Sequence, residues 1–248
     1  DPFTLTERDG KLYGRGACDM KGYLAAVLAM VPAFKALPLK VPLHIIFSYD
    51  EEVGCTGVRP LVAELGARAV ACDASEAQGV ARLFAVAERD FGVPELVVFN
   101  AGYRARGPIA EIDPIEAEAA LRNNALAGFL VGQGAARLML GEGKGSIFFT
   151  GATAGIKGFA GSAPFAMGKF ALRGLAQSMA RELGPKGIHV AHFIIDGGIA
   201  GTRGSRAVNE DDVLLSPQAI AEAYLNVHKQ HRSAWTHEID LRPWNESF

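Results

Sequence analysis

The chain has 248 residues, of which 49% are hydrophobic and 21% are charged, and its formal net charge is −2. This length and hydrophobic content suit a folded domain with a large core, and the dispersed basic residues argue against nucleic acid or an anionic membrane as a partner. No apolar run is long enough to span a membrane. Cys18, Cys55 and Cys72 lack the spacing of a metal or redox motif, so we interpret them as reduced thiols and expect a cytoplasmic protein.

Segments with the hydrophobic period of a helix alternate with short apolar runs that are typical of buried strands. Pro38 and Gly66 mark helix ends, and Pro164 marks a helix start. This alternation predicts an α/β fold, a doubly wound parallel sheet with helices on both faces and the functional residues at the carboxyl ends of its strands. In chain order we expect helices over 20–37, 56–65, 77–91, 114–140 and 164–183, and strands over 41–49, 67–73, 95–100, 146–152 and 189–195.

A set of short motifs runs through residues 63–248, at the ends of predicted strands and inside two predicted helices. Small residues directly after a strand let a ligand approach the backbone closely, and they stand in the turn NAG after the strand over 95–100. In chain order the set consists of Asp73, Asn100-Ala101-Gly102, Asn124, Lys169 and the turn IDGGI, which includes Gly197 and Ile199.

This ordered set resembles the short-chain dehydrogenase/reductase family over most of that family's length. The resemblance implies a Rossmann-like fold and an oxidoreductase that uses NAD or NADP. Asp73 would face the adenine of the cofactor, Asn124 would hold a water of the proton relay, and Lys169 would bind the nicotinamide ribose. The implied cofactor-binding residues are Asp73, Asn100, Ala101, Gly102, Lys169, Gly197 and Ile199, and the implied catalytic residues are Asn124 and Lys169.

Two hydroxyl side chains on which that family's chemistry depends are replaced. Its tyrosine stands four residues before the lysine and donates a proton to the substrate carbonyl, but that position is Phe165 here. Its serine, which hydrogen-bonds the same carbonyl, aligns with Ala152. General acid–base groups contribute about 10²–10⁴-fold each, so we expect a weak or inactive enzyme. Thr150 and Thr153 flank the serine position, and we interpret them as structural residues.

The family also opens with a strand and a glycine-rich turn that holds the pyrophosphate, and no such sequence precedes Ala63. The chain instead carries YGRGACDMKG, which we interpret as a structural turn because a lone GxG is weak evidence for phosphate binding. We therefore expect a foreign α/β segment, residues 1–62, in place of the first strand and its turn, followed by a dehydrogenase-like domain over 63–248. The choice between NAD and NADP stays open.

Residues 1–62 carry DPF, LYGRGACDMKG and SYDEEVGC, and these resemble a fragment of the zinc-dependent amidohydrolase family that includes acetylornithine deacetylase. By this resemblance Asp19 would bridge two zinc ions, Glu51 would act as a general base and Glu52 would bind metal. The histidine ligands of that family have no counterpart here, and three carboxylates alone rarely form a closed zinc site. We therefore expect no zinc, and we interpret the three carboxylates as helix caps.

Three hypotheses remain open at this stage. The one we favour is a weak or inactive short-chain dehydrogenase acting on a small molecule, and the others are a zinc hydrolase fragment and a non-enzymatic dimeric scaffold. The helices over 114–140 and 164–183 are the expected surfaces of a homo-oligomer. His189 and His192 should face opposite sides of the sheet, because they lie three residues apart in one strand. The resemblance also implies a last strand near the C-terminus.

Overall fold

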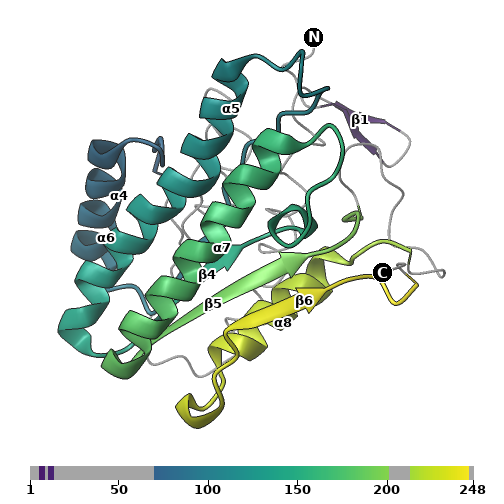
Figure 1. Ribbon diagram of the computed structural model, residues 1–248. Coiled ribbons are helices and arrows are strands. Elements are labelled where there is room, and N and C mark those ends of the chain that lie inside the picture. The colour runs from purple at the N-terminus through teal and green to yellow at the C-terminus, as the bar shows by residue number, and fades with distance from the viewer. Residues whose placement is uncertain (1–5, 9–10, 14–69, 201–212, 246–248) are drawn as a thin grey trace.

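The computed structural model describes residues 6–8, 11–13, 70–200 and 213–245 (Figure 1). Among the described residues, no helix is long and apolar enough to cross a membrane. The predicted boundary at residue 62 lies outside this part of the chain. So do Asp19, Glu51, Glu52, the helices predicted over 20–37 and 56–65, and the strand predicted over 41–49.

Helices and strands alternate along the described chain, as the sequence predicts. The strands are β1 (Thr6–Arg8), β2 (Lys11–Tyr13), β3 (Leu96–Phe99), β4 (Gly145–Thr150), β5 (Ile188–Ile195) and β6 (Glu238–Leu241). The helices are α4 (Ala77–Phe91), α5 (Pro114–Leu121), α6 (Ala127–Glu142), α7 (Ala163–Leu183) and α8 (Pro217–His228), with a π-helical turn at Arg122–Leu126 and 3-10 turns at Thr153–Gly155, Gly184–Lys186 and Arg232–Ala234.

The strands β3, β4, β5 and β6 form a parallel sheet in that order, and β1 pairs with β2 in an antiparallel pair. Helices α4, α6 and α7 pack on one face of the parallel sheet, and α8 packs on the other (Figure 1). This arrangement confirms the predicted α/β, Rossmann-like class. The carboxyl ends of parallel strands lie at one edge of a sheet, and that edge is where a site is expected. The proposed replacement of the first strand stays a prediction.

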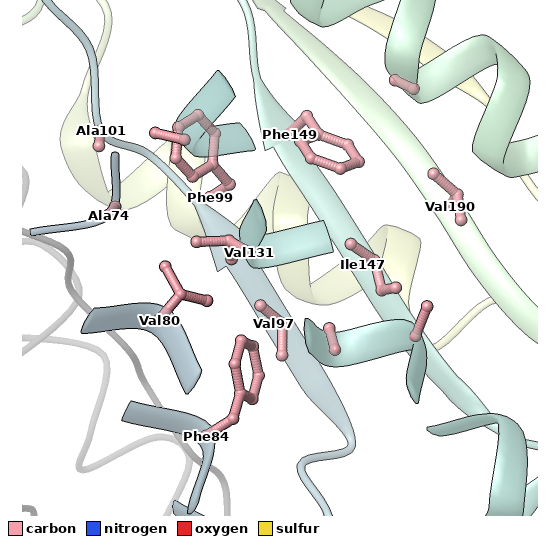
Figure 2. Packing of buried hydrophobic residues seen from close by; sticks show 14 of the residues in the cluster. Ala74, Val80, Phe84, Val97, Phe99, Ala101, Val131, Ile147, Phe149 and Val190 are labelled. Carbon is pink, nitrogen blue, oxygen red and sulfur yellow. The ribbon is translucent and has the colours of Figure 1, made fainter. Parts of the chain in front are cut away.

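Alternate strand residues pack into two separate cores. On one face Val97, Phe99, Ile147 and Phe149 are buried beneath α4, α6 and α7 (Figure 2). On the other face Phe148, Phe193 and Tyr224 of α8 pack ring on ring, with the Phe193 and Tyr224 centroids 3.6 Å apart. Complete burial of a large apolar side chain contributes about 1.5–3 kcal/mol. Aromatic side chains therefore pack against β4 and β5 on both faces of the sheet, and this packing fixes the position of the carboxyl ends of the two strands.

Several predicted elements differ from the observed ones. The strand predicted over 67–73 is wrong for its described part, because Val70–Asp73 pair with no described strand. The chain turns into α4 there, and the Asp73 carboxylate accepts a hydrogen bond from the Ser75 N–H at 2.8 Å. The single helix predicted over 114–140 is interrupted by the π-helical turn, and α8 was not predicted. The last strand implied by the resemblance is present as β6.

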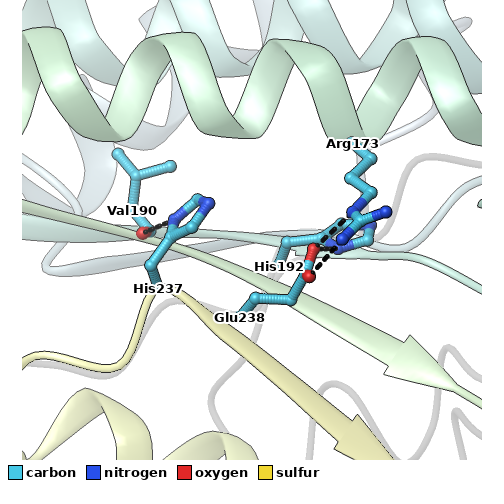
Figure 3. A network of polar contacts seen from close by, with 5 residues as sticks. All are labelled: Arg173, Val190, His192, His237 and Glu238. Atoms are coloured by element: carbon cyan, nitrogen blue, oxygen red, sulfur yellow. Dashed lines mark hydrogen bonds and ion pairs between the residues drawn. The ribbon is translucent and has the colours of Figure 1, made fainter. Parts of the chain in front are cut away.

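The two histidines of β5 confirm the predicted alternation. His189 stacks on Trp235, with ring centroids 4.7 Å apart, and its ring also meets the edge of Phe148 in the α8 core. His192 lies on the opposite face, where it contacts Glu238 of β6, which Arg173 of α7 also binds (Figure 3). Both histidines are therefore packing residues of the sheet rather than members of one cluster.

Candidate functional site

The turns that follow β3, β4 and β5 meet at one edge of the sheet. Residues 100–102 follow β3, residues 151–153 follow β4, and residues 196–199 follow β5. Helix α7 passes close to the second turn, since a Cβ added to Gly155 would lie 3.2 Å from the Lys169 carbonyl oxygen. The candidate site is thus built from three strand ends and one helix.

Lys169 is a buried cation with a neutral partner. The residue is 5% exposed, and its Nζ donates to the Thr150 carbonyl at the end of β4 at 2.9 Å. Burial lowers the pKa of Lys169 to about 8, because the charged ammonium loses hydration in the interior. An ammonium has three N–H donors, and among the described residues no carboxylate forms an ion pair with this one. Lys169 therefore retains donors for a bound molecule.

Asn124 lies in the π-helical turn between α5 and α6, a local widening of the helix that is frequent at functional sites. Its Nδ2 donates to the carbonyls of Tyr103 and Ala120, each at 2.8 Å. The residue is 0% exposed, and its Oδ1 accepts no hydrogen bond from the described residues. Buried amide oxygens normally have a donor. This oxygen is therefore a buried acceptor whose hydrogen-bonding capacity the described residues leave unused.

Two glycines bring these polar groups together. A Cβ on Gly102 would lie 3.0 Å from Asn124 Oδ1 and 3.5 Å from Lys169 Nζ, so the turn after β3 faces both atoms. A Cβ on Gly168 would lie 2.8 Å from Asn124 Cβ, so α7 reaches the π-helical turn only because this residue has no side chain. The structure thus gathers Gly102, Asn124 and Lys169 around one point.

Phe165 precedes Lys169 by one helical turn and is half-buried. Lys169 Nζ lies 5.9 Å from the centroid of its ring, and Arg104 Cζ lies 5.3 Å from the same centroid. Both distances are in the range of cation–π contacts. Ala152 follows β4 on the same edge of the sheet and likewise has no proton to donate. The structure therefore places two cations beside Phe165, one of the two positions that lack hydroxyls.

The flanking threonine hydroxyls are engaged elsewhere. Thr150 Oγ1 and Tyr224 Oη share a hydrogen bond of 2.8 Å on the side of α8. Thr153 Oγ1 donates to Asp196 Oδ1, and Asp196 Oδ2 pairs with Arg242 at 2.7 Å. Asp196 is only 6% exposed, and sequence reasoning missed it. The signal was an aspartate directly after an apolar strand. Both threonine hydroxyls therefore have hydrogen-bond partners within the fold.

The other predicted site residues are more scattered. Asn100 and Ala101 continue β3 toward Gly102, and Asp73 is exposed, with its carboxylate at the start of α4. Gly197 has a φ of +153°, and a Cβ there would lie 2.6 Å from Pro243. Ile199 forms a bridge with Leu215. Gly197 and Ile199 therefore pack against the C-terminal part of the chain.

The comparisons with known proteins agree with the α/β fold. The sequence profile described as enoyl-(acyl carrier protein) reductase matches residues 43–229. A short-chain dehydrogenase from Rhodopseudomonas palustris is 36% identical, with a TM-score of 0.71 over 90% of this chain and 94% of that one. The chain belongs to the short-chain dehydrogenase family. A metagenomic short-chain oxidoreductase in complex with NADP shares the fold at 22% identity, with a TM-score of 0.70 over 90% of this chain and 93% of that one.

A second similarity is confined to a short stretch. Acetylornithine deacetylase of Myxococcus xanthus is 52% identical over 62 residues, which are 25% of this chain and 16% of that protein. This finding confirms the predicted resemblance to a fragment of that enzyme, and the chain spans about a sixth of the relative's length. Within the described parts of the chain, no group of three or more His, Cys, Asp or Glu side chains could hold a metal ion.

The described residues of this short-chain dehydrogenase fit part of a nucleotide cofactor. Lys169 retains N–H donors for an oxygen of that cofactor, and Asn124 Oδ1 is a buried acceptor without a described donor. The segment in which the family's pyrophosphate turn would stand lies outside the described residues.

Proposed function

We propose that this chain is an NAD- or NADP-dependent oxidoreductase that acts weakly, or not at all, on a small carbonyl compound. The observation that carries the proposal is the assembly of Lys169 and Asn124 around Gly102, beside two positions where the family's hydroxyls are replaced. Support also comes from the family itself and from the metagenomic relative solved with NADP. We place the protein in the cytoplasm, with no nucleic acid or membrane as partner.

The separate roles of the cofactor and the protein in such a site explain why the rate of reduction should be low. The nicotinamide supplies the hydride, and the protein binds, orients and delivers a proton. Lys169 and Asn124 serve binding and orientation, whereas Phe165 and Ala152 supply neither a proton nor a hydrogen bond to the substrate oxygen. Loss of a general acid costs about 10²–10⁴-fold in rate. We therefore expect the protein to bind the nucleotide and to reduce a substrate slowly or not at all.

Nucleotide binding is the first test. The protein should bind NADH or NADPH. Lys169→Met should raise the dissociation constant at least about tenfold, because a hydrogen bond to a charged group contributes about 1.5–3 kcal/mol. Titration followed by nicotinamide fluorescence measures this constant. Lys157→Met is the matched control, since Lys157 is exposed and lies beside the Phe159 ring. If neither nucleotide binds to the wild-type protein, only the fold resemblance remains.

We also propose that the chain forms a homo-oligomer through α6 and α7. Large apolar side chains are exposed on both helices, with Phe129 at 44%, Met167 at 49% and Phe170 at 44%. Exposed apolar residues that gather on neighbouring helices are typical of protein interfaces. The occupant we favour is a second copy of this chain, which would also satisfy the scaffold hypothesis.

Light scattering at micromolar concentration should therefore give at least a dimeric mass, and Phe170→Asp should shift it toward the monomer, because a buried charge without a partner is costly. Ile109→Asp is the control, since Ile109 is 77% exposed but lies in the loop after β3. A wild-type monomer would remove the proposed interface and the scaffold hypothesis with it.

A zinc hydrolase is the second candidate, and the short match to acetylornithine deacetylase is what favours it. Asp19, Glu51 and Glu52 would be its carboxylates, but we propose that the chain holds no zinc because the family's histidine ligands have no counterpart in the sequence. Metal analysis of the dialysed protein should give well under one zinc per chain. A stoichiometric content that Glu52→Ala abolishes would revive the hydrolase hypothesis.

A further inference from the structure

We propose that Lys169 is itself the catalytic residue that delivers the proton to the substrate oxygen, in place of the missing tyrosine. This inference rests on the proposed nucleotide-dependent reduction and adds a role for a residue that the family uses to bind ribose. It begins from what surrounds Phe165, where a proton donor is needed and the ring has none. Among the described residues around that ring, Lys169 is the group that can give up a proton at neutral pH.

The neighbouring polar groups are excluded by their contacts. Tyr103 Oη donates to Glu116 at 2.6 Å, and Thr153 Oγ1 donates to Asp196. Ser162 Oγ donates to the Phe159 carbonyl at 3.0 Å. Arg104 faces the Phe165 ring, but a guanidinium stays protonated in proteins and cannot act as an acid. These groups can bind or polarise a substrate, but they do not replace the tyrosine as the donor of a proton to the substrate oxygen.

Lys169 lies close to the Phe165 ring and carries a proton that it can release. It stands on the same face of α7 as Phe165, because residues four apart in a helix lie one above the other, and its Nζ is 5.9 Å from the ring centroid. One hydrogen bond, to the Thr150 carbonyl, leaves two N–H groups, one for the nucleotide and one for a substrate oxygen. Burial lowers the pKa of Lys169 to about 8, close to the value at which a general acid is most effective.

The charged surroundings of Lys169 are consistent with this role. Burial is the main cause of the lowered pKa of His192 on β5, and the charges of Lys169 and of Arg173 on α7 act in the same direction. Arg104 approaches from the loop after β3. No described carboxylate forms an ion pair with Lys169 that would stabilise its charged form. The proton is therefore held less tightly than in an exposed lysine.

The step balances with a reduced nicotinamide dinucleotide as the reductant. The carbonyl carbon accepts a hydride from the dihydronicotinamide, which is oxidised, and the C=O π bond breaks as a C–H bond forms. One N–H bond of Lys169 breaks and an O–H bond forms at the carbonyl oxygen, which leaves a neutral amine. A proton from water then restores the ammonium.

The test separates charge from proton transfer. Single-turnover oxidation of NADPH or NADH by 9,10-phenanthrenequinone, an activated dicarbonyl, is followed with protein in excess. Lys169→Arg keeps the charge but cannot release a proton, so it should slow the reaction about 10²-fold or more while the nucleotide dissociation constant changes by less than about threefold. In the wild-type protein the rate should fall as pH rises through about 8, because the acid must be protonated.

A measurement without turnover guards against a variant that does not fold. In nucleotide-free wild-type protein labelled with ¹³C at lysine Cε, one resonance should titrate with a midpoint near 8 and vanish in Lys169→Arg. A midpoint at the ordinary lysine pKa overturns the inference, as does a Lys169→Arg variant with more than a third of the wild-type rate. Nucleotide binding without hydride transfer also overturns it. Absence of nucleotide binding would instead remove the proposed function.

Discussion

Restoring both hydroxyls, in the double variant Ala152→Ser/Phe165→Tyr, should raise the rate of nicotinamide-dependent carbonyl reduction by about 10²–10⁴-fold. The position is prepared for this change, because Lys169 and Arg104 already face the Phe165 ring at 5.9 and 5.3 Å. Both cations would favour the phenolate of the introduced tyrosine and so lower its pKa. The serine would add a hydrogen bond to the same substrate oxygen. Steady-state reduction of an activated dicarbonyl, at saturating nucleotide, measures the gain.

The single variants should each give much less than the double variant, since groups that act on one substrate oxygen are not additive. Phe170→Tyr adds the same hydroxyl to the residue next to Lys169, on the exposed side of α7, and should leave the rate unchanged. Nucleotide affinity should stay within about threefold in all of these variants, because none of the substitutions removes a polar group. A double variant that binds nucleotide as well as the wild-type protein and is no faster would show that the lost hydroxyls do not limit this site.

Hydrophobic period and helix-end signals were enough to predict most of the described fold. Helix α4 has its predicted bounds, and α7 begins one residue before the predicted start. Helix α8 was missed although its signals are present, since Ser216 accepts a hydrogen bond from the Ala219 N–H and Pro217 occupies the first turn. The π-helical turn could not be predicted, because Asn124 is held by the Tyr103 carbonyl, which lies outside its own helix.

The order of the motifs along the chain predicted only some of the residues of the candidate site. The spacing of Phe165 and Lys169 predicted that they share one face of a helix, and the family resemblance implied that Asn124 belongs to the same site. The contacts of Asp196 with Thr153 and Arg242 were not predictable in this way. They join the ends of β4, β5 and β6, and only the register of the sheet determines which of these residues meet.

A second large effect is expected from the polar network between β5, β6 and α7 (Figure 3). Arg173 binds Glu238 through two hydrogen bonds of 2.8 and 2.6 Å, and His192 Nδ1 lies 3.0 Å from Glu238 Oε2. His192 is 0% exposed. Burial lowers its pKa from 6.5 to about 4 and outweighs the attraction of Glu238, while Lys169 and Arg173 act in the same direction as burial.

The free energy of unfolding should therefore fall as the pH drops from about 6.5 to about 4, and His192 alone accounts for up to about 3 kcal/mol of that loss. Between these values the unfolded chain binds a proton at His192 that the folded chain does not bind, so acid favours unfolding. Burial also lowers the pKa values of His189 and His228, and these histidines add to the same slope. Urea unfolding midpoints measured between pH 4 and pH 8 would record it.

His192→Asn isolates the contribution of this histidine. The asparagine amide can still donate to Glu238 but does not titrate, so the dependence of stability on pH should become shallower between about 6.5 and 4. The variant should be less stable than the wild-type protein at pH 8, because the smaller side chain leaves space in the layer under α7. Ser233→Ala, on an exposed turn of the same C-terminal region, removes no titrating group and should keep the wild-type slope. If His192 is buried in its neutral form, its removal must reduce the number of protons that the chain takes up on unfolding. An unchanged slope in His192→Asn would therefore mean that other groups cause the loss of stability in acid.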